Sequence, residues 1–290
     1  MFNGVGTAII TPFLKNGEVD YNSLKRITKF QTDNKIDAII ILGTTGEAPV
    51  ITDEERYNII KTVTETAKKK CKIIIGTGSN DTKKVIFWNK QAEEFKPDGL
   101  LIVNPYYNKG TQESLIEHYS FISSNTKLPI ILYNVPSRTS MNLLPETVVK
   151  IHNLNNNIVA VKEASGSISQ IAHLCSIKPK SLFVFSGNDD QTLPIMSLGA
   201  NGVISVFSNS YPKQMKQIVD SYLNKNYDKS LVFHNKYLKM MNDLFIETNP
   251  APIKYVMSKL GYCENKLRLP LGSISDKSKE ILNRSMLEIK

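Results

Sequence analysis

Lys162 stands in the stretch IVAVKEASG, residues 158–166, where a buried strand would carry another aliphatic side chain. Strand side chains alternate between two faces, so Lys162 shares its face with Ile158 and Ala160. If that face is buried, desolvation lowers the pKa of the amine, and a neutral amine attacks a keto group to form a Schiff base. The alternative is a lysine that ends a strand and reaches solvent or pairs with Glu163.

The stretch YNVPSRT, residues 133–139, supplies a phenol and a guanidinium after another apolar run. Tyr133 is expected beside Lys162 on the neighbouring strand, where a phenol can carry protons during imine and enamine formation. Arg138 follows Pro136, which stiffens the loop, and can bind a carboxylate through two parallel hydrogen bonds. The alternatives are a core tyrosine with a solvated hydroxyl and an arginine in a surface salt bridge.

The stretch GTTGE, residues 43–47, follows a third apolar run and contains two adjacent hydroxyls, Thr44 and Thr45. A turn rich in backbone N–H groups and hydroxyls suits a carboxylate, which needs fixed donors at close range. Such a cluster more often only turns the chain and caps the following helix.

The other candidate residues predict no metal and no cofactor. Asp189 and Asp190, in SGNDD, are expected to cap a helix rather than to bind magnesium. Neither GxGxxG nor GxxxxGK[ST] occurs, and no Ser/His/Asp elbow is present. The four histidines fall in helical spacers without metal-ligand spacing: His118, His152, His173 and His234.

Eight short apolar runs must position these residues, and helix-length amphipathic segments separate them. The runs cover residues 4–10, 37–43, 72–78, 99–105, 129–135, 158–164, 182–187 and 202–207. Helical spacing is clearest at residues 20–31, 53–69, 81–95, 112–124 and 145–152. This alternation predicts a (β/α)8 TIM barrel, and near-continuous apolar strands indicate a parallel sheet covered by helices. A doubly wound open sheet is the alternative, although its glycine fingerprint is missing.

The pattern changes after residue 207, because from Pro212 onward only helical periodicity remains. We expect a barrel core over residues 1–210 and a C-terminal helical region, packed on the barrel, over residues 211–290. Active sites of such barrels lie at the C-terminal ends of the strands, which is where the lysine, tyrosines, threonines and arginine fall.

Composition favours a soluble intracellular protein. The chain has 36 basic and 27 acidic residues, a net charge of +9, but the charges are dispersed and do not indicate nucleic-acid binding. Three separate cysteines indicate a reducing cytoplasm rather than a disulfide framework. The chain shows no signal peptide and no apolar run long enough for a membrane span, so we expect no membrane association.

These motifs, taken in order, resemble the dihydrodipicolinate synthase family of pyruvate-dependent class I aldolases. The resemblance covers essentially the whole chain and includes GTAIITPF, GTTGE, GTGSN, NPYYNK, YNVPSRT, VKEASG, SGNDD, GVISV, ETNPAPIK and LRLPL. It implies that pyruvate condenses with L-aspartate 4-semialdehyde to give 4-hydroxy-tetrahydrodipicolinate, on the route to diaminopimelate and lysine.

The resemblance also assigns roles to residues. Lys162 would form the Schiff base with pyruvate, and Tyr133 would transfer protons in a relay with Thr44 and with Tyr107 from a partner subunit. Thr45 would hold the carboxylate of pyruvate, and Gly187 and Ile204 would line the pyruvate pocket through their backbone. Arg138 would bind the carboxylate of the semialdehyde. The family's shared site implies a homotetramer built as a dimer of dimers.

The chain departs from the lysine-inhibited members of the family at the effector site. The matching positions hold Ala48, Pro49, Asp53, Arg56 and Lys84, and only Asn80 and Tyr106 are retained. Lys84 stands where a carboxylate should meet the effector's ammonium, and like charges repel. We therefore expect weak or absent inhibition by lysine.

Two alternatives stay open. Another pyruvate-dependent aldolase, such as N-acetylneuraminate lyase, resembles the chain in its lysine and tyrosine, but that family shows GSTGE and lacks the arginine seen here as Arg138. A basic barrel that binds nucleic acid or acts as a scaffold would need clustered charge and interleaved aromatic residues.

Overall fold

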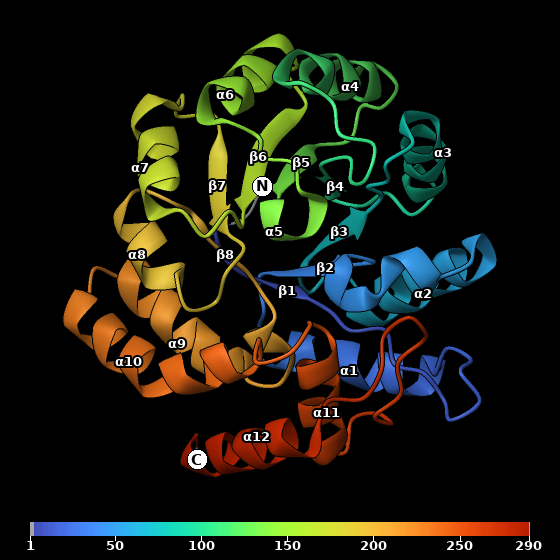
Figure 1. Ribbon diagram of the computed structural model, residues 1–290, viewed down its shortest axis with the longest axis vertical. Coiled ribbons are helices and arrows are strands. Elements are labelled where there is room, and N and C mark those ends of the chain that lie inside the picture. Colours follow the sequence, from blue (N-terminus) through green and yellow to red (C-terminus); the bar gives the residue numbers. More distant parts are fainter. Residues whose placement is uncertain (1–2, 290) are drawn as a thin grey trace. The chain divides into compact units, whose positions relative to one another are not determined.

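Eight parallel strands alternate with helices along the chain, and in the computed structural model, which describes residues 3–289, they form a closed barrel in the order β1 to β8 (Figure 1). The strands are β1 (Gly4–Ala8), β2 (Ala38–Ile41), β3 (Lys72–Gly76), β4 (Gly99–Val103), β5 (Ile130–Asn134), β6 (Ile158–Glu163), β7 (Phe183–Ser186) and β8 (Gly202–Ser205). Each lies within one of the predicted apolar runs. The predicted TIM barrel fold is therefore confirmed.

The chain divides into two compact units by its internal contacts. Unit 1 contains residues 73–204 together with Asn3, and unit 2 contains residues 4–72 and 205–289. The predicted boundary between a barrel core and a C-terminal region, at residues 210 and 211, falls inside unit 2 and stays a prediction. Residues 1, 2 and 290, at the ends of the two predicted regions, lie outside the described part.

Unit 1 is built around parallel strand pairs whose register fixes which side chains meet. Tyr133 on β5 lies opposite Lys162 on β6, and the next pair is Asn134 opposite Glu163. The helices are α3 (Thr82–Glu93), α4 (Gln112–Ser124), α5 (Pro136–Thr139), α6 (Pro145–Leu154), α7 (Ile168–Ile177) and α8 (Thr192–Ser197). In Figure 1, α4, α6 and α7 lie around the outside of strands β4 to β7.

Side-chain caps explain where several of these helices begin. The hydroxyl of Thr111 accepts a hydrogen bond from Ser114 N at the start of α4, and the side chain of Asp81 accepts one from Lys83 N at the start of α3. Pro136 occupies the first turn of α5, where its missing N–H costs nothing. The loops after the strands therefore end at defined residues.

Unit 2 combines β1, β2 and the helices at both ends of the chain. Its helices are α1 (Tyr21–Asp33), α2 (Asp53–Ala67), α9 (Pro212–Leu223), α10 (Tyr227–Asp243), α11 (Ala251–Lys259) and α12 (Asp276–Glu288), with short 3-10 turns η1 (Thr44–Gly46), η2 (Ala48–Val50) and η3 (Phe207–Asn209). The buried amide of Asn209 donates to Ala8 O at 2.8 Å and accepts from Ile10 N at 3.0 Å. These bonds hold the segment after β8 against β1.

Within residues 3–289, no helix has both the length and the apolar character that a membrane crossing requires.

Candidate active site

Lys162 and Tyr133 form a buried pair at the ends of two neighbouring strands. Their side chains are only 5% and 6% exposed. The Lys162 Nζ atom lies 4.4 Å from the centre of the Tyr133 ring. A primary amine beside a phenol, shielded from water, is the arrangement that Schiff-base chemistry with proton transfer requires.

The neighbouring residue Glu163 faces the opposite side of β6. Its carboxylate accepts hydrogen bonds from Ser165 N at 2.7 Å and from Asn134 Nδ2 at 3.1 and 3.2 Å. Gln170 of α7 approaches the same carboxylate at 3.5 Å. Burial raises the pKa of Glu163, and the hydrogen bonds from Asn134 and Ser165 oppose that shift. The strand thus places its lysine and its glutamate on different faces, which argues against the alternative of a Lys162–Glu163 pair.

A chain of buried amides connects Glu163 to β4. Asn134 Oδ1 accepts from Asn104 Nδ2 at 3.0 Å and from Leu143 N at 2.9 Å. The hydroxyl of Tyr119 on α4 donates to Asn104 Oδ1 at 2.7 Å, and burial raises the pKa of that phenol. This network fixes the ends of β4, β5 and β6 relative to one another, and with them the pair Tyr133 and Lys162.

Gly187 lies against Lys162 at a position that admits no side chain. A Cβ atom there would sit 2.5 Å from Ala164 Cβ and 3.1 Å from Lys162 Cε. The Gly187 N–H donates to Glu163 O at 2.7 Å, which holds the turn after β7 against β6. Ile204, on β8, is fully buried. Glycine is therefore required where the backbone approaches the lysine most closely.

Tyr107 and Arg138 lie on exposed segments of unit 1. Tyr107, in the loop after β4, is 91% exposed and has a backbone φ of +69°. Arg138 is exposed on α5, directly after β5. The structure thus brings Lys162, Tyr133 and Gly187 together, whereas Tyr107 points its ring at solvent.

The predicted threonines belong to unit 2, in the turn η1. Thr45 is 2% exposed, and its hydroxyl accepts a hydrogen bond from Asn249 Nδ2 at 3.1 Å. The next residue in the turn, Gly46, accepts a bond from Thr11 Oγ1 at 2.7 Å through its carbonyl. Thr44 is half-buried. The hydrogen bond from Asn249, in the C-terminal part of the chain, therefore restricts the rotamer of Thr45.

Sequence reasoning missed a buried ion pair behind this turn. Glu47 and Lys254 have fully buried side chains and contact each other directly. Lys254 belongs to α11, where every residue from Ala251 to Met257 is buried. A lysine inside such an apolar stretch was a signal for a buried charge, as it was for Lys162, although it does not identify the partner.

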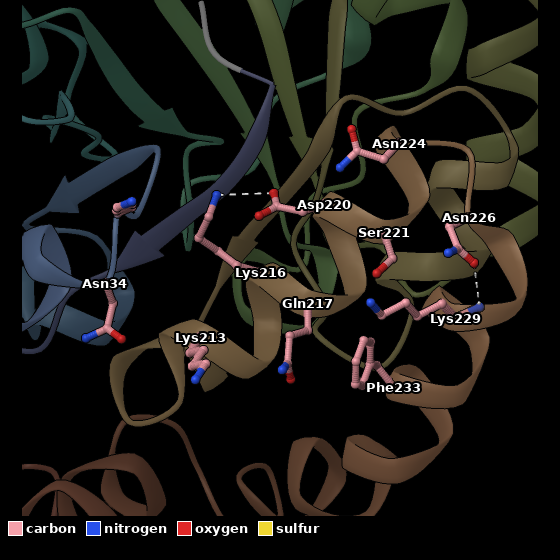
Figure 2. A pocket seen from close by; sticks show the side chains of 11 residues that line it. Asn34, Lys213, Lys216, Gln217, Asp220, Ser221, Asn224, Asn226, Lys229 and Phe233 are labelled. Atoms are coloured by element: carbon pink, nitrogen blue, oxygen red, sulfur yellow. Dashed lines mark hydrogen bonds and ion pairs between the residues drawn. The ribbon is translucent and has the colours of Figure 1, made fainter.

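Two other features take no part in this site. In the described residues, no group of three or more histidine, cysteine, aspartate or glutamate side chains is placed to hold a metal ion. A surface cleft of about 500 Å³ in unit 2 lies between α9 and α10, and Figure 2 shows its lining. Its central lysine, Lys216, pairs with Asp37 at 3.0 Å and with Asp220 at 3.2 Å. None of the predicted site residues is among those that line it.

Known proteins of one family match the chain along its full length. The model of the dihydrodipicolinate synthetase family matches residues 1–289. The 4-hydroxy-tetrahydrodipicolinate synthase of Thermotoga neapolitana is 46% identical over 291 residues, with 99% of each chain covered. The crystal structure of dihydrodipicolinate synthase from Thermotoga maritima matches with a TM-score of 0.98 and 44% identity, covering 100% of this chain and 99% of that one.

A second solved structure adds information on assembly. It is described as the first monomeric dihydrodipicolinate synthase variant, and it matches with a TM-score of 0.97 and 44% identity, covering 99% of this chain and 97% of that one. The family match and both solved structures extend over at least 99% of this chain. The chain therefore belongs to the dihydrodipicolinate synthetase family.

Proposed function

We propose that the protein condenses pyruvate with L-aspartate 4-semialdehyde to give 4-hydroxy-tetrahydrodipicolinate, the first step toward diaminopimelate and lysine. The observation that carries the proposal is the buried pair of Lys162 and Tyr133, with the amine 4.4 Å from the ring centre. Family membership supports the choice of this reaction over others that use the same lysine chemistry. The rival lyase that cleaves N-acetylneuraminate is not favoured by any feature of the site.

Lys162 starts the reaction as a nucleophile. Its amine attacks C2 of pyruvate, and the carbinolamine loses water to give the imine. Loss of a proton from C3 gives an enamine, which attacks the aldehyde carbon of the semialdehyde. The semialdehyde's own amino group then displaces Lys162 from C2, which closes the ring and frees the enzyme. Tyr133 would donate and accept the protons of these steps, because its phenol lies next to the amine.

The remaining site residues would bind the two substrates. Thr45 would hold the carboxylate of pyruvate, and Thr44 would pass protons between Tyr133 and Tyr107 of a partner subunit. Gly187 and Ile204 would line the pyruvate pocket through their backbone. Arg138 would bind the carboxylate of the semialdehyde, for which a guanidinium on an exposed short helix is well suited.

We further propose a cytoplasmic homotetramer that is assembled as a dimer of dimers. Support comes from Tyr107, whose ring is 91% exposed in the single chain and needs a partner to become part of a site. The barrel core and the C-terminal helical region would belong to each subunit. Because a monomeric variant exists in the family, the molar mass of this protein in solution tests the proposed tetramer.

Weak or absent inhibition by lysine is part of the proposal. At the positions that match the effector site, Arg56 is 2% exposed, and burial lowers its pKa to about 10. Lys84 lies with its Nζ atom 4.9 Å from the centre of the Trp88 ring. The Lys84 ammonium would repel the ammonium groups of lysine.

Borohydride trapping tests the proposed function. The protein is incubated with pyruvate, reduced and digested, and we expect the mass of a reduced pyruvate adduct on the peptide that carries Lys162. The Lys162→Arg variant, which keeps the charge but cannot form the imine, is the matched control. An adduct on another lysine, or turnover of N-acetylneuraminate instead of the semialdehyde, would overturn the proposal.

A further inference from the structure

The C-terminal part of unit 2 contacts the predicted pyruvate turn at two points. Asn249 precedes α11, is 4% exposed, and donates from Nδ2 to Thr45 Oγ1 at 3.1 Å. Lys254, five positions further, pairs with Glu47 at the other end of the same turn. The two contacts join segments that are more than 200 positions apart in the chain.

The direction of the Asn249 hydrogen bond matters for ligand binding. A threonine hydroxyl has one proton to donate and lone pairs to accept with. Because Asn249 fills an acceptor position on Thr45, the hydroxyl's own proton stays available to a carboxylate. An amide N–H that donates into the oxygen also makes that proton a better donor.

The ion pair fixes the backbone that carries Thr45. Glu47 adopts a left-handed backbone conformation, with φ at +54°, which a non-glycine residue keeps only when its surroundings hold it. Its carboxylate contacts Lys254 and accepts from Arg268 N at 3.1 Å. Lys254 also donates to Lys266 O at 2.9 Å, and its Nζ atom lies 3.9 Å from the centre of the Phe13 ring. Both charges are thus paired and desolvated, and removing one would leave the other buried without compensation.

Arg268 closes the far side of the turn. Its guanidinium donates to Val50 O at 2.8 Å and forms two hydrogen bonds with Glu55, at 2.7 and 2.5 Å. Glu55 completes the cap of α2 by accepting from Thr52 N at 3.0 Å. The turn is therefore held on both sides by residues that come from the end of the chain.

We propose that Asn249 is a positioning residue that orients the Thr45 hydroxyl toward the carboxylate of the keto acid, and that the pair Glu47 and Lys254 holds the turn in which it acts. The inference rests on the proposed function and deepens it, since it assigns a role in substrate binding to the helical C-terminal segment. Asn249 acts through Thr45 and need not touch the reacting atoms.

The experiment measures how adduct formation depends on pyruvate. For the unchanged protein and for Asn249→Ala, borohydride-trapped adduct is quantified across a pyruvate series, and steady-state KM and kcat are recorded alongside. We expect the half-saturating pyruvate concentration to rise about tenfold in Asn249→Ala, with KM for the semialdehyde unchanged and kcat within about threefold, since one oriented hydrogen bond to a charged group is lost.

A double-mutant cycle separates positioning from general damage. Thr45→Val removes the hydroxyl, so adding Asn249→Ala to it should raise the half-saturating concentration little further. Asn242→Ala, an exposed asparagine in the same C-terminal region, is the matched control and should behave like the unchanged protein. Thermal unfolding of each variant is measured, and Asn249→Ser provides a smaller change if the alanine variant does not fold.

The outcomes distinguish the two proposals. Equal pyruvate dependence in Asn249→Ala and the unchanged protein, or fully additive effects of the two substitutions, would overturn the positioning role while leaving the proposed function intact. Absence of the Lys162 adduct from the unchanged protein would overturn the proposed function and this inference together.

Discussion

Tyr133 and Lys162 are direct partners in the register of β5 and β6, and the next pair along the same strands is Asn134 with Glu163. The first pair brings an amine to a phenol ring, and the second pair is joined by hydrogen bonds of 3.1 and 3.2 Å. Two adjacent residue pairs of β5 and β6 therefore hold the proposed reacting residues and the hydrogen bonds that support them.

Tyr133→Phe should lose proton transfer while keeping the packing. The ring stays beside Lys162, so we expect thermal stability close to that of the unchanged protein, with kcat reduced at least about 100-fold. Steady-state assays of the condensation and the rate of adduct trapping check this. Tyr255→Phe, which removes a phenol hydroxyl on α11 bonded to Asn283 at 2.9 Å, is the control. A Tyr133→Phe enzyme within threefold of normal kcat would show that another group moves the protons.

Gly187→Ala should damage the site through steric overlap. The added methyl would meet Ala164 Cβ at 2.5 Å and Lys162 Cε at 3.1 Å, so we expect a loss of stability of about 1–3 kcal/mol and slower adduct formation. Gly272→Ala is the matched control, because a Cβ atom there meets nothing within 4 Å. Urea unfolding and adduct trapping are the measurements. If both alanine variants are equally stable and reactive, the close approach at Gly187 is not a constraint.

His118 should make folding stability depend on pH. Burial lowers its pKa from 6.5 to about 4, and its Nδ1 atom lies 2.9 Å from Thr82 Oγ1. Because the folded-state pKa lies below the unfolded one, the unfolded chain binds more protons between these values. The stabilisation is thus complete above pH 6.5 and is lost as the pH falls toward 4.

The His118→Gln variant should remove this contribution. We expect the loss of stability between neutral pH and pH 4 to be smaller in the variant by roughly 2 kcal/mol, a value reduced from the full shift because the ring is partly accessible to solvent. Urea unfolding at a series of pH values provides the data. Parallel stability curves for the two proteins would contradict the prediction.

Lysine at sub-millimolar concentration should leave the initial rate essentially unchanged. The proposed reason is that Lys84 stands where the resemblance places a carboxylate for the ammonium group of the effector, and like charges repel. Initial rates with both substrates at their KM values, with and without lysine, test this directly. Lys84→Glu is the informative variant, because it restores a carboxylate at position 84. Inhibition by lysine should be no weaker in this variant than in the unchanged protein.

Tyr107→Phe should lower activity without lowering stability. Its ring is 91% exposed in the single chain, so its hydroxyl contributes little to folding, and the effect we expect comes through the proposed partner subunit. We expect kcat to fall about tenfold or more, with an unchanged molar mass in sedimentation experiments. Tyr227→Phe, another exposed tyrosine, is the control. An active protein that sediments as a monomer would contradict both the role of Tyr107 and the proposed tetramer.

The barrel could be predicted because each of its strands lies in a clear aliphatic run of the sequence. Near-continuous aliphatic runs are typical of strands covered on both faces, and each of the eight runs contains a strand. The predicted runs extend past the observed ends, as at residues 99–105 against Gly99–Val103, because strand pairing stops before the loops that follow. The neighbourhood of Tyr133 and Lys162 followed from the parallel order of their strands.

The long-range contacts that hold the proposed site residues in place could not be predicted in the same way. Periodicity identifies a helix or a strand, but it does not tell which distant loop a side chain will contact. Asn249 and Thr45 are 204 positions apart, and their hydrogen bond depends on how the last helices pack. The pair Glu47 and Lys254 is of the same kind, since neither residue has a local pattern that names its partner.

Because side chains alternate along β6, the order of Lys162 and Glu163 decides which of them faces the proposed site. Lys162 and Glu163 face opposite sides, so a shift of the strand by one position would exchange them and place a carboxylate where the amine belongs. A shift of β6 by one position would therefore remove the proposed nucleophile from its face of the strand, even with every side chain kept. In the proposed mechanism, the identity of the nucleophile depends on the parity of its position along β6 as much as on its chemistry.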